Sequence, residues 1–252
     1  NRRVLQHFDD VLVILVQREE ILPKPPNGIS VEDRELFVKH FKNRKAVERV
    51  AYGNPSADEV YSGCKTLFVQ PDELNTEEIG QQVAQFKPDF AFIFGVNLIL
   101  DPVISRLPKD KINLHLGLSP WYKGGATLYW PFYFLQPQFC GVTFHQITEK
   151  PDAGEIVHQS VPKLNYGDTI HDVGAKCVLQ AADEVDSLLT FWLRNKEFKG
   201  QIQKTSGRNW IGVDFHPSQL RVIYKLFNDD IVDKYLDGEL EQRKPKLFSC
   251  LT

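Results

Sequence analysis

Residues 111–125 read KINLHLGLSPWYKGG, and residues 141–154 read GVTFHQITEKPDAG. The first stretch begins as a strand in which Asn113 and His115 are two positions apart, so both side chains point to one face. The second stretch is another strand, followed by a polar loop that contains Asp152. One site thereby gains an amide that can polarise a carbonyl, an imidazole that can exchange protons, and a carboxylate. The two stretches predict a catalytic centre.

Strands and helices alternate through most of the remaining sequence. Strands are predicted at residues 10–17, 64–69 and 89–94, and helices at residues 30–49, 75–86 and 166–191. The near-continuous apolar run at residues 10–17 is typical of a strand buried on both faces of a parallel sheet. The alternation predicts an α/β, Rossmann-like fold with a largely parallel sheet and helices on both faces. Ligands of such sheets bind at the carboxyl ends of strands, where we expect the Gly95 turn, the loop after His115 and the Asp152 loop.

The composition of the chain narrows its class. Its 252 residues are 42% hydrophobic and 25% charged, which is typical of a soluble globular protein. The length suits one α/β domain of residues 1–199 and a small C-terminal region of residues 200–252. The net charge of −3 argues against a nucleic-acid partner, and no apolar run approaches membrane-spanning length. The four widely spaced cysteines form no C-x-x-C pair, which favours reduced thiols in a cytoplasmic protein.

The motif N-x-H-x-x-L-x-P-x-Y-K-G, followed by G-V-T-x-H and D-A-G, resembles the formyltransferase family that uses 10-formyltetrahydrofolate. That family includes glycinamide-ribonucleotide, methionyl-tRNA and nucleotide-sugar N-formyltransferases. The resemblance implies a catalytic set of Asn113, His115 and Asp152. Asn113 would donate to the formyl oxygen, His115 would deliver or relay a proton, and Asp152 would hold the imidazole or accept a proton through water. The sequence L-G-L-S-P after His115 resembles that of the nucleotide-sugar branch of the family.

The same resemblance implies a co-substrate and a further strand. The co-substrate is 10-formyltetrahydrofolate, with no metal, and the folate pocket is expected to contain Gly95, Leu98, Leu100 and Thr148. A formyltransferase fold would begin with a strand that precedes residue 10. We therefore expect a gap in the sheet beside the strand at residues 10–17.

Two histidines raise an alternative chemistry. With His115 and Asp152, the side chains of His145 and His158 could form a His/His/His/Asp metal site. The sequence lacks the H-x-H or H-E-x-x-H spacing that would support such a site. We therefore expect His145 to line or underpin the catalytic site instead.

Residues for binding the acceptor are predicted on turns: Trp121, Tyr122, Lys123, Arg208 and Trp210. Two rings and a cation on one loop are expected to cover a ligand. The pair Arg208 and Trp210 suits a pyrophosphate and a stacked base, with a packing role as the alternative. The resemblance implies that the acceptor is a nucleotide-linked amino sugar, such as a 4-amino-4,6-dideoxy sugar, used in lipopolysaccharide O-antigen biosynthesis.

Three other functions remain open. Methionyl-tRNA formylation is disfavoured by the acidic balance and the short C-terminal region, because a tRNA-binding domain is usually basic. Formyltetrahydrofolate hydrolysis would replace the attacking amine with water. A binding protein without activity is disfavoured because Asn113, His115 and Asp152 are all present.

Two surface features could contact partners. Residues 221–229, RVIYKLFND, carry an apolar stripe that needs a cover, either the main domain or a second subunit in a homodimer. The helix at residues 30–49 carries a basic cluster, Lys42, Arg44, Lys45 and Arg49. We interpret this cluster as a solvated helix face, with phosphate binding as the alternative.

Overall fold

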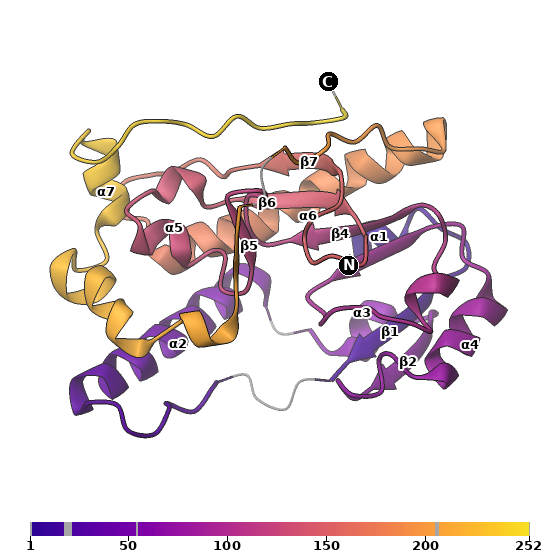
Figure 1. Ribbon diagram of the computed structural model, residues 1–252, viewed down its shortest axis with the longest axis horizontal. Coiled ribbons are helices and arrows are strands. Elements are labelled where there is room, and N and C mark those ends of the chain that lie inside the picture. Colours follow the sequence, from indigo (N-terminus) through magenta and orange to yellow (C-terminus); the bar gives the residue numbers. More distant parts are fainter. Residues whose placement is uncertain (1, 18–21, 54, 205–206, 252) are drawn as a thin grey trace.

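The computed structural model describes residues 2–17, 22–53, 55–204 and 207–251 (Figure 1). The strands are β1 (Leu12–Val16), β2 (Lys65–Val69), β3 (Ala91–Phe94), β4 (Lys111–His115), β5 (Tyr122–Gly124), β6 (Val142–Gln146), β7 (Ile156–Ser160) and β8 (Arg208–Trp210). The α-helices are α1 (Arg2–Leu5), α2 (Val31–Tyr52), α3 (Ala57–Tyr61), α4 (Glu77–Phe86), α5 (Trp130–Tyr133), α6 (Ile170–Asn195) and α7 (Ile231–Leu236). Shorter helical turns are η1 (Ile104–Arg106), η2 (Pro137–Phe139), η3 (Gly212–Asp214), η4 (Pro217–Gln219) and η5 (Val222–Leu226). The predicted α/β class is confirmed.

The sheet that carries the predicted catalytic residues has the strand order β3-β4-β6-β7. β3 is parallel to β4, but β6 and β7 are antiparallel to their neighbours, so this sheet is mixed. Gln146, at the end of β6, pairs with Ile112 near the start of β4. The loop after β6 therefore begins at the amino end of β4. This corrects the expectation that the Asp152 loop follows a strand end at the same edge as the Gly95 turn.

The predicted gap beside residues 10–17 is present. Among the described strands, β1 pairs with β2 and not with β3. A cavity of about 990 Å³ separates them, lined on one side by Val13 and Ile14 and on the other by Phe92 and Ile93. The smaller of the two hydrophobic clusters lies beside this pair of strands and includes Val69, Ile79 and Val83.

The larger hydrophobic cluster is centred on α6. Val173, Leu188 and Leu189 of this helix are fully buried and share the cluster with Ile112 and Phe144 of the sheet. The first turn of α6 is fixed by a capping box between Thr169 and Asp172, and that of α2 by the N-cap Ser30, whose side chain accepts from the Asp33 amide. Among the described helices, none is both long enough and apolar enough to cross a membrane.

The C-terminal region packs on the main body of the molecule. Ile223 and Ile231 are fully buried in the larger cluster, so the main domain covers part of segment 221–229. Leu226 of the same segment is 75% exposed. The tail, in yellow in Figure 1, runs along β7, where the amide of Gln159 donates to Phe248 and that of Cys250 donates to Val157. The division of the chain at residue 200 stays a prediction.

A buried polar cluster joins α2, α6 and η5. The Tyr224 hydroxyl lies 2.9 Å from His40 Nδ1 and 3.2 Å from His171 Nε2, and the two imidazole centroids are 4.5 Å apart. Burial lowers the pKa of His171 to about 4, and the Arg44 charge adds to this shift. The Asp172 charge and the His40 backbone oppose it. Both rings are therefore uncharged at neutral pH, because the pKa of His40 is also lowered by burial.

We predict that His171 makes the free energy of unfolding depend on pH. Its folded pKa is depressed, so its contribution is fully present above pH 6.5 and is lost as the pH falls towards about 4. The shift corresponds to about 3 kcal/mol. Urea unfolding across this range should show a steeper acid destabilisation for the wild type than for His171→Gln.

The difference between the two proteins is the measurement, because another group titrates in the same range. Burial raises the pKa of Asp229 to about 6, which gives a contribution of opposite sign that both proteins share. Parallel stability curves for the wild type and His171→Gln would contradict the prediction.

Candidate active site

The pairing of β4 with β6 places Asn113 directly opposite His145. The Asn113 amide nitrogen donates to His145 Nε2 at 3.2 Å, while His145 Nδ1 lies 2.8 Å from the Gln146 carbonyl oxygen. Because a carbonyl oxygen only accepts, Nδ1 carries the ring hydrogen and Nε2 is the acceptor in the neutral ring. The expectation that His145 lines or underpins the site is confirmed.

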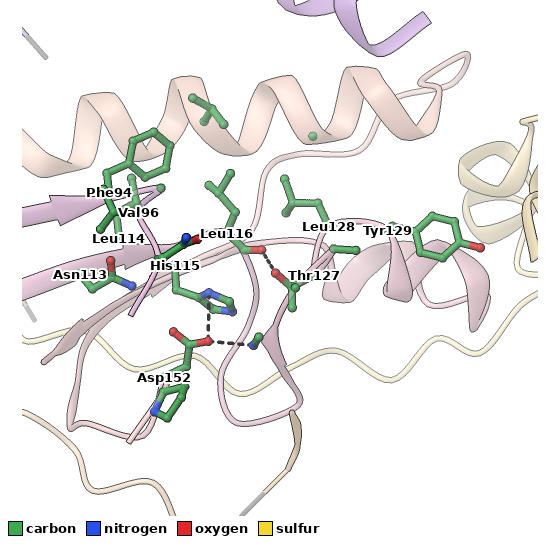
Figure 2. Close-up of a pocket in the computed structure, with 18 of the residues that line it drawn as sticks. Phe94, Val96, Asn113, Leu114, His115, Leu116, Thr127, Leu128, Tyr129 and Asp152 are labelled. Atoms are coloured by element: carbon green, nitrogen blue, oxygen red, sulfur yellow. Dashed lines mark hydrogen bonds and ion pairs between the residues drawn. The ribbon is translucent and has the colours of Figure 1, made fainter. Parts of the chain in front are cut away.

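His115 lies on the same face of β4 and is fixed by the loop that follows it. Its Nε2 donates to the Tyr122 carbonyl oxygen at 3.0 Å, which leaves Nδ1 as the nitrogen that can accept a proton. That Nδ1 lies 3.5 Å from Asp152 Oδ2 (Figure 2). Burial lowers the pKa of His115, and the Asp152 charge opposes the shift. His115 is therefore a neutral ring poised beside a carboxylate.

Gly117 allows the chain to turn closely around the imidazole of His115. A Cβ atom at this position would lie 2.6 Å from His115 Nε2 and 2.7 Å from the Tyr122 carbonyl oxygen. Below it, the Thr143 hydroxyl donates to the Gly117 carbonyl oxygen and accepts from the Ser119 amide. The contacts of this loop require a residue without a side chain at position 117.

Asp152 reaches the site from the loop between β6 and β7. Its Oδ2 accepts from the Gly124 amide at 2.8 Å, and its Oδ1 lies 3.3 Å from His145 Nε2. Burial by itself raises the pKa of Asp152, but the hydrogen bond with His145 and the charge of His115, both of which require the protonated rings, together with the Gly124 amide outweigh it and lower the pKa to about 2. The carboxylate is therefore ionised at neutral pH, although its side chain is only 13% exposed.

Two residues outside the predicted set hold this carboxylate in place. Gly124 has φ +85°, and a Cβ there would lie 2.1 Å from the Trp210 carbonyl oxygen, so β5 can pair with β8 only if this residue is glycine. Gln203 donates from its Nε2 to the carbonyl oxygens of Asp152 and Gly154. Gly124 was visible as the last residue of the Y-K-G motif, whereas nothing in the sequence distinguishes Gln203.

The three predicted catalytic residues line one cavity of about 830 Å³. Gly95, Leu98 and Thr148 line it as well. Leu100 departs from the prediction: it lies outside the lining, with its side chain 48% exposed, because its amide is bound by the Asn75 side chain. The same Asn75 side chain donates to the Leu98 carbonyl oxygen and so fixes the loop that follows β3.

The residues predicted to bind the acceptor lie beside the cavity rather than in its lining. Trp121 packs edge-on against Phe139, with ring centroids 5.5 Å apart. The buried Tyr122 donates its hydroxyl to Gln136. Lys123 is buried, and its charge contributes to lowering the pKa of His115 after burial and the His145 charge. The structure thus gives these residues contacts within the protein.

Arg208 and Trp210 lie on β8, which pairs with β5. One face of the Trp210 ring stacks on Trp130 at 4.0 Å, and the Arg208 guanidinium lies 3.9 Å from its centroid. Both contacts need a ring face, so the two faces of Trp210 are covered and a stacked base has no place there. Arg208 also binds Asp214 at 2.8 Å. The contacts of Arg208 and Trp210 therefore fit the packing role that the sequence left open as an alternative to nucleotide binding.

His158 lies apart from the other site residues. It contacts Ser249 Oγ at 2.8 Å and Glu184 Oε2 at 3.3 Å, on the side of β7 that faces the tail. In the part of the chain that the structure describes, no group of three or more histidine, cysteine or acidic side chains is arranged to hold a metal ion. The four-residue metal site considered from the sequence is not assembled.

The description "Formyl transferase" belongs to the family profile that matches residues 31–185, more than half of the chain. The chain belongs to the formyl transferase family. This formyltransferase is therefore an enzyme of the N-formyl transfer class, as the sequence motifs implied.

Solved structures share the fold of this formyltransferase. PseJ from Anoxybacillus kamchatkensis, in complex with UDP-4,6-dideoxy-4-formamido-L-AltNAc and tetrahydrofolate, has a TM-score of 0.51 and 21% identity, covering 89% of this chain and 97% of its own. A sugar N-formyltransferase from a Shewanella species has a TM-score of 0.52 and 16% identity, covering 81% and 77%. Glycinamide ribonucleotide transformylase 1 from Symbiobacterium toebii has a TM-score of 0.51 and 14% identity, covering 78% and 94%. The formyltransferase fold is confirmed.

We predict that Asp152→Asn lowers the pKa of His115. The Asp152 charge favours the imidazolium form of His115, so its removal leaves the effect of burial less opposed. An NMR titration of the histidine ring resonances measures the change. Glu149→Gln is the matched control, because Glu149 is an exposed carboxylate of the same loop. An unchanged or raised pKa in Asp152→Asn would contradict the described contact.

Proposed function

We propose that this formyltransferase transfers the formyl group of 10-formyltetrahydrofolate to the amino group of a nucleotide-linked amino sugar. The observation that carries the chemistry is the convergence of Asn113, His115 and Asp152 on one cavity. The amide and the imidazole come from one strand, β4, and the carboxylate comes from the loop between β6 and β7, and these elements hold the three groups at fixed distances (Figure 2).

Asn113 is the group that stabilises the developing negative charge. One hydrogen of its amide nitrogen is directed to His145 Nε2, and the second remains to donate to the formyl oxygen. As the neutral amine attacks the formyl carbon, the carbonyl double bond becomes a single bond and the oxygen takes the charge. A single donor of this kind lowers the activation free energy by about 3 kcal/mol or more.

His115 and Asp152 handle the protons of the reaction. Nδ1 of the neutral His115 ring can take the proton that the amine loses, because Nε2 is already bound to a carbonyl oxygen. The adjacent Asp152 carboxylate stabilises the resulting imidazolium. The intermediate then collapses, the bond to the folate nitrogen breaks, and the proton is returned to that nitrogen. Tetrahydrofolate and the formamide leave.

The loop between Gly95 and Leu98 and the turn that carries Thr148 are proposed to bind the folate. Both segments line the cavity, and the first is held rigid by Asn75, so it presents backbone groups at fixed positions. Pro151 and Ile99 add apolar surface to the same wall, which suits the face of a pterin ring. Leu100 is not part of this proposal.

A sugar nucleotide is the acceptor that the available facts favour. PseJ, which shares the fold, was crystallised with a UDP-linked formamido sugar and tetrahydrofolate. The net charge of −3 does not favour a tRNA, and part of the C-terminal region packs into the main core. We therefore propose a nucleotide-linked 4-amino-4,6-dideoxy sugar as the substrate, with lipopolysaccharide O-antigen biosynthesis as its use.

The experiment compares acceptors with one enzyme preparation. GDP-, dTDP- and UDP-linked 4-amino-4,6-dideoxy sugars, initiator Met-tRNA and water alone are each incubated with 10-formyltetrahydrofolate, and the products are identified by mass spectrometry. We expect formylation of one of the amino-sugar nucleotides. Formylation of tRNA alone, or release of formate with every acceptor, would replace the proposal with one of the two alternatives.

We predict that Asn113→Ala lowers kcat by about a hundredfold to a thousandfold, because the tetrahedral intermediate loses its donor. The affinity for tetrahydrofolate should stay within about twofold, since the amide acts on charge that develops during the reaction. Asn195→Ala, at the exposed end of α6, is the control. Equal losses in folate affinity and rate would show that Asn113 binds the co-substrate instead.

A further inference from the structure

The loop that carries Asp152 is bound by a residue of the C-terminal region. Gln203 donates from its Nε2 to the carbonyl oxygen of Asp152 at 2.8 Å and to that of Gly154 at 2.7 Å. The amide nitrogen of a glutamine side chain has two hydrogens, so one can be directed to each oxygen. One side-chain group therefore holds the backbone on both sides of Ala153.

The backbone of Asp152 depends on such support because of its conformation. Asp152 has φ +47°, in the left-handed region that residues other than glycine rarely adopt. A residue stays in this region only when its surroundings fix it there. The end of the same loop is also confined, because a Cβ atom at Gly154 would lie 1.8 Å from the Gln146 carbonyl oxygen. The orientation of Asp152 thus depends on contacts with other segments.

The position of Gln203 follows from a backbone pairing with β7. Gln201 and Ile156 form an antiparallel bridge, in which the amide of each residue donates to the carbonyl oxygen of the other at 2.8 Å. Continued by two residues, this register places Gln203 opposite Gly154. The short pairing thus delivers the side-chain amide of Gln203 to the loop of Asp152.

The C-terminal region also supports the carboxylate of Asp152. β8 pairs with β5, and the Gly124 amide of β5 donates to Asp152 Oδ2 at 2.8 Å. The carboxylate lies 3.5 Å from His115 Nδ1 and 3.3 Å from His145 Nε2. Both distances exceed those of close charged hydrogen bonds. A displacement of the loop away from β4 would therefore weaken the attraction between Asp152 and a protonated His115 further.

We propose that Gln203 is a positioning residue for the reaction, which holds Asp152 against His115 without contacting either substrate. Gln203 does not line the catalytic cavity, so it acts through Asp152. This role rests on the proposed function, in which Asp152 stabilises the imidazolium that forms when His115 takes the proton of the amine. A segment outside residues 31–185, which the family profile matches, thereby takes part in proton handling.

The first test measures the pKa of His115 by NMR and needs no substrate. The groups whose charges act on His115 are Asp152, His145 and Lys123, and the hydrogen bonds of Gln203 go to the loop of the first. Gln203→Met removes both hydrogen bonds at a similar side-chain length and should lower the pKa of His115, in the direction expected for Asp152→Asn. In the double variant, the pKa should equal that of Asp152→Asn alone, because Gln203 acts through this carboxylate.

Gln201→Met is the matched control, because it makes the same chemical change at an exposed side chain and leaves the backbone bridge in place. Gln203→Asn keeps the donor on a shorter side chain, so its His115 pKa should lie between those of the wild type and Gln203→Met. This milder variant supplies the measurement if Gln203→Met does not fold. A His115 pKa equal to that of the wild type in the Gln203 variants, or a further decrease in the double variant, would overturn the proposal.

The second test is kinetic and uses the acceptor that the wild type formylates. Gln203→Met should lower kcat by about tenfold to a hundredfold, with KM for the acceptor and for 10-formyltetrahydrofolate within about twofold, since only the position of Asp152 changes. An unchanged kcat, or a loss that appears in KM instead, would overturn the role of Gln203 in the reaction. A wild type that formylates no sugar nucleotide would overturn the proposed acceptor, whereas the effect of Gln203 on the His115 pKa would still be observed.

Discussion

The rest of the site depends on one constraint: the charge of the mostly buried Asp152 carboxylate has to be stabilised by neighbouring groups. A carboxylate that is 13% exposed destabilises a fold unless donors and charges offset its lost hydration. Here the Gly124 amide donates to the carboxylate, and the His115 and His145 imidazoles compensate its charge when either ring is protonated. They come from β5, β4 and β6, so the loop between β6 and β7 can hold Asp152 in place only when all three strands are correctly paired.

Backbone carbonyl groups decide which ring nitrogens remain for chemistry. The Tyr122 carbonyl oxygen binds Nε2 of His115, and the Gln146 carbonyl oxygen binds Nδ1 of His145. The other nitrogens, Nδ1 of His115 and Nε2 of His145, lie 3.5 Å and 3.3 Å from the Asp152 carboxylate, and Nε2 of His145 also accepts from the Asn113 amide. A second proton on either ring would be stabilised by this carboxylate. The fold thus sets the tautomer of each ring through the orientation of main-chain groups, and for His115 this orientation depends on the loop around Gly117.

The C-terminal region supports the site from outside the cavity. β8 pairs with β5 and fixes the strand whose Gly124 amide binds Asp152, while Gln203 holds the backbone of the Asp152 loop. The stacking of Trp210 between Trp130 and Arg208 anchors β8 to the main core. Residues that resemble a nucleotide-binding cluster in the sequence thus support the Asp152 carboxylate through packing.

The sequence by itself determined the α/β class, the strands that carry Asn113 and His115, and the membership in the formyl transferase family, because strand periodicity and short motifs are local properties. Only the tertiary structure decided the direction of β6, the covered faces of Trp210, the position of Leu100 outside the cavity, and the cluster of His40, His171 and Tyr224. Each of these depends on contacts between residues far apart in the chain. Tautomers and side-chain partners follow from such contacts, and no local pattern of residues encodes them.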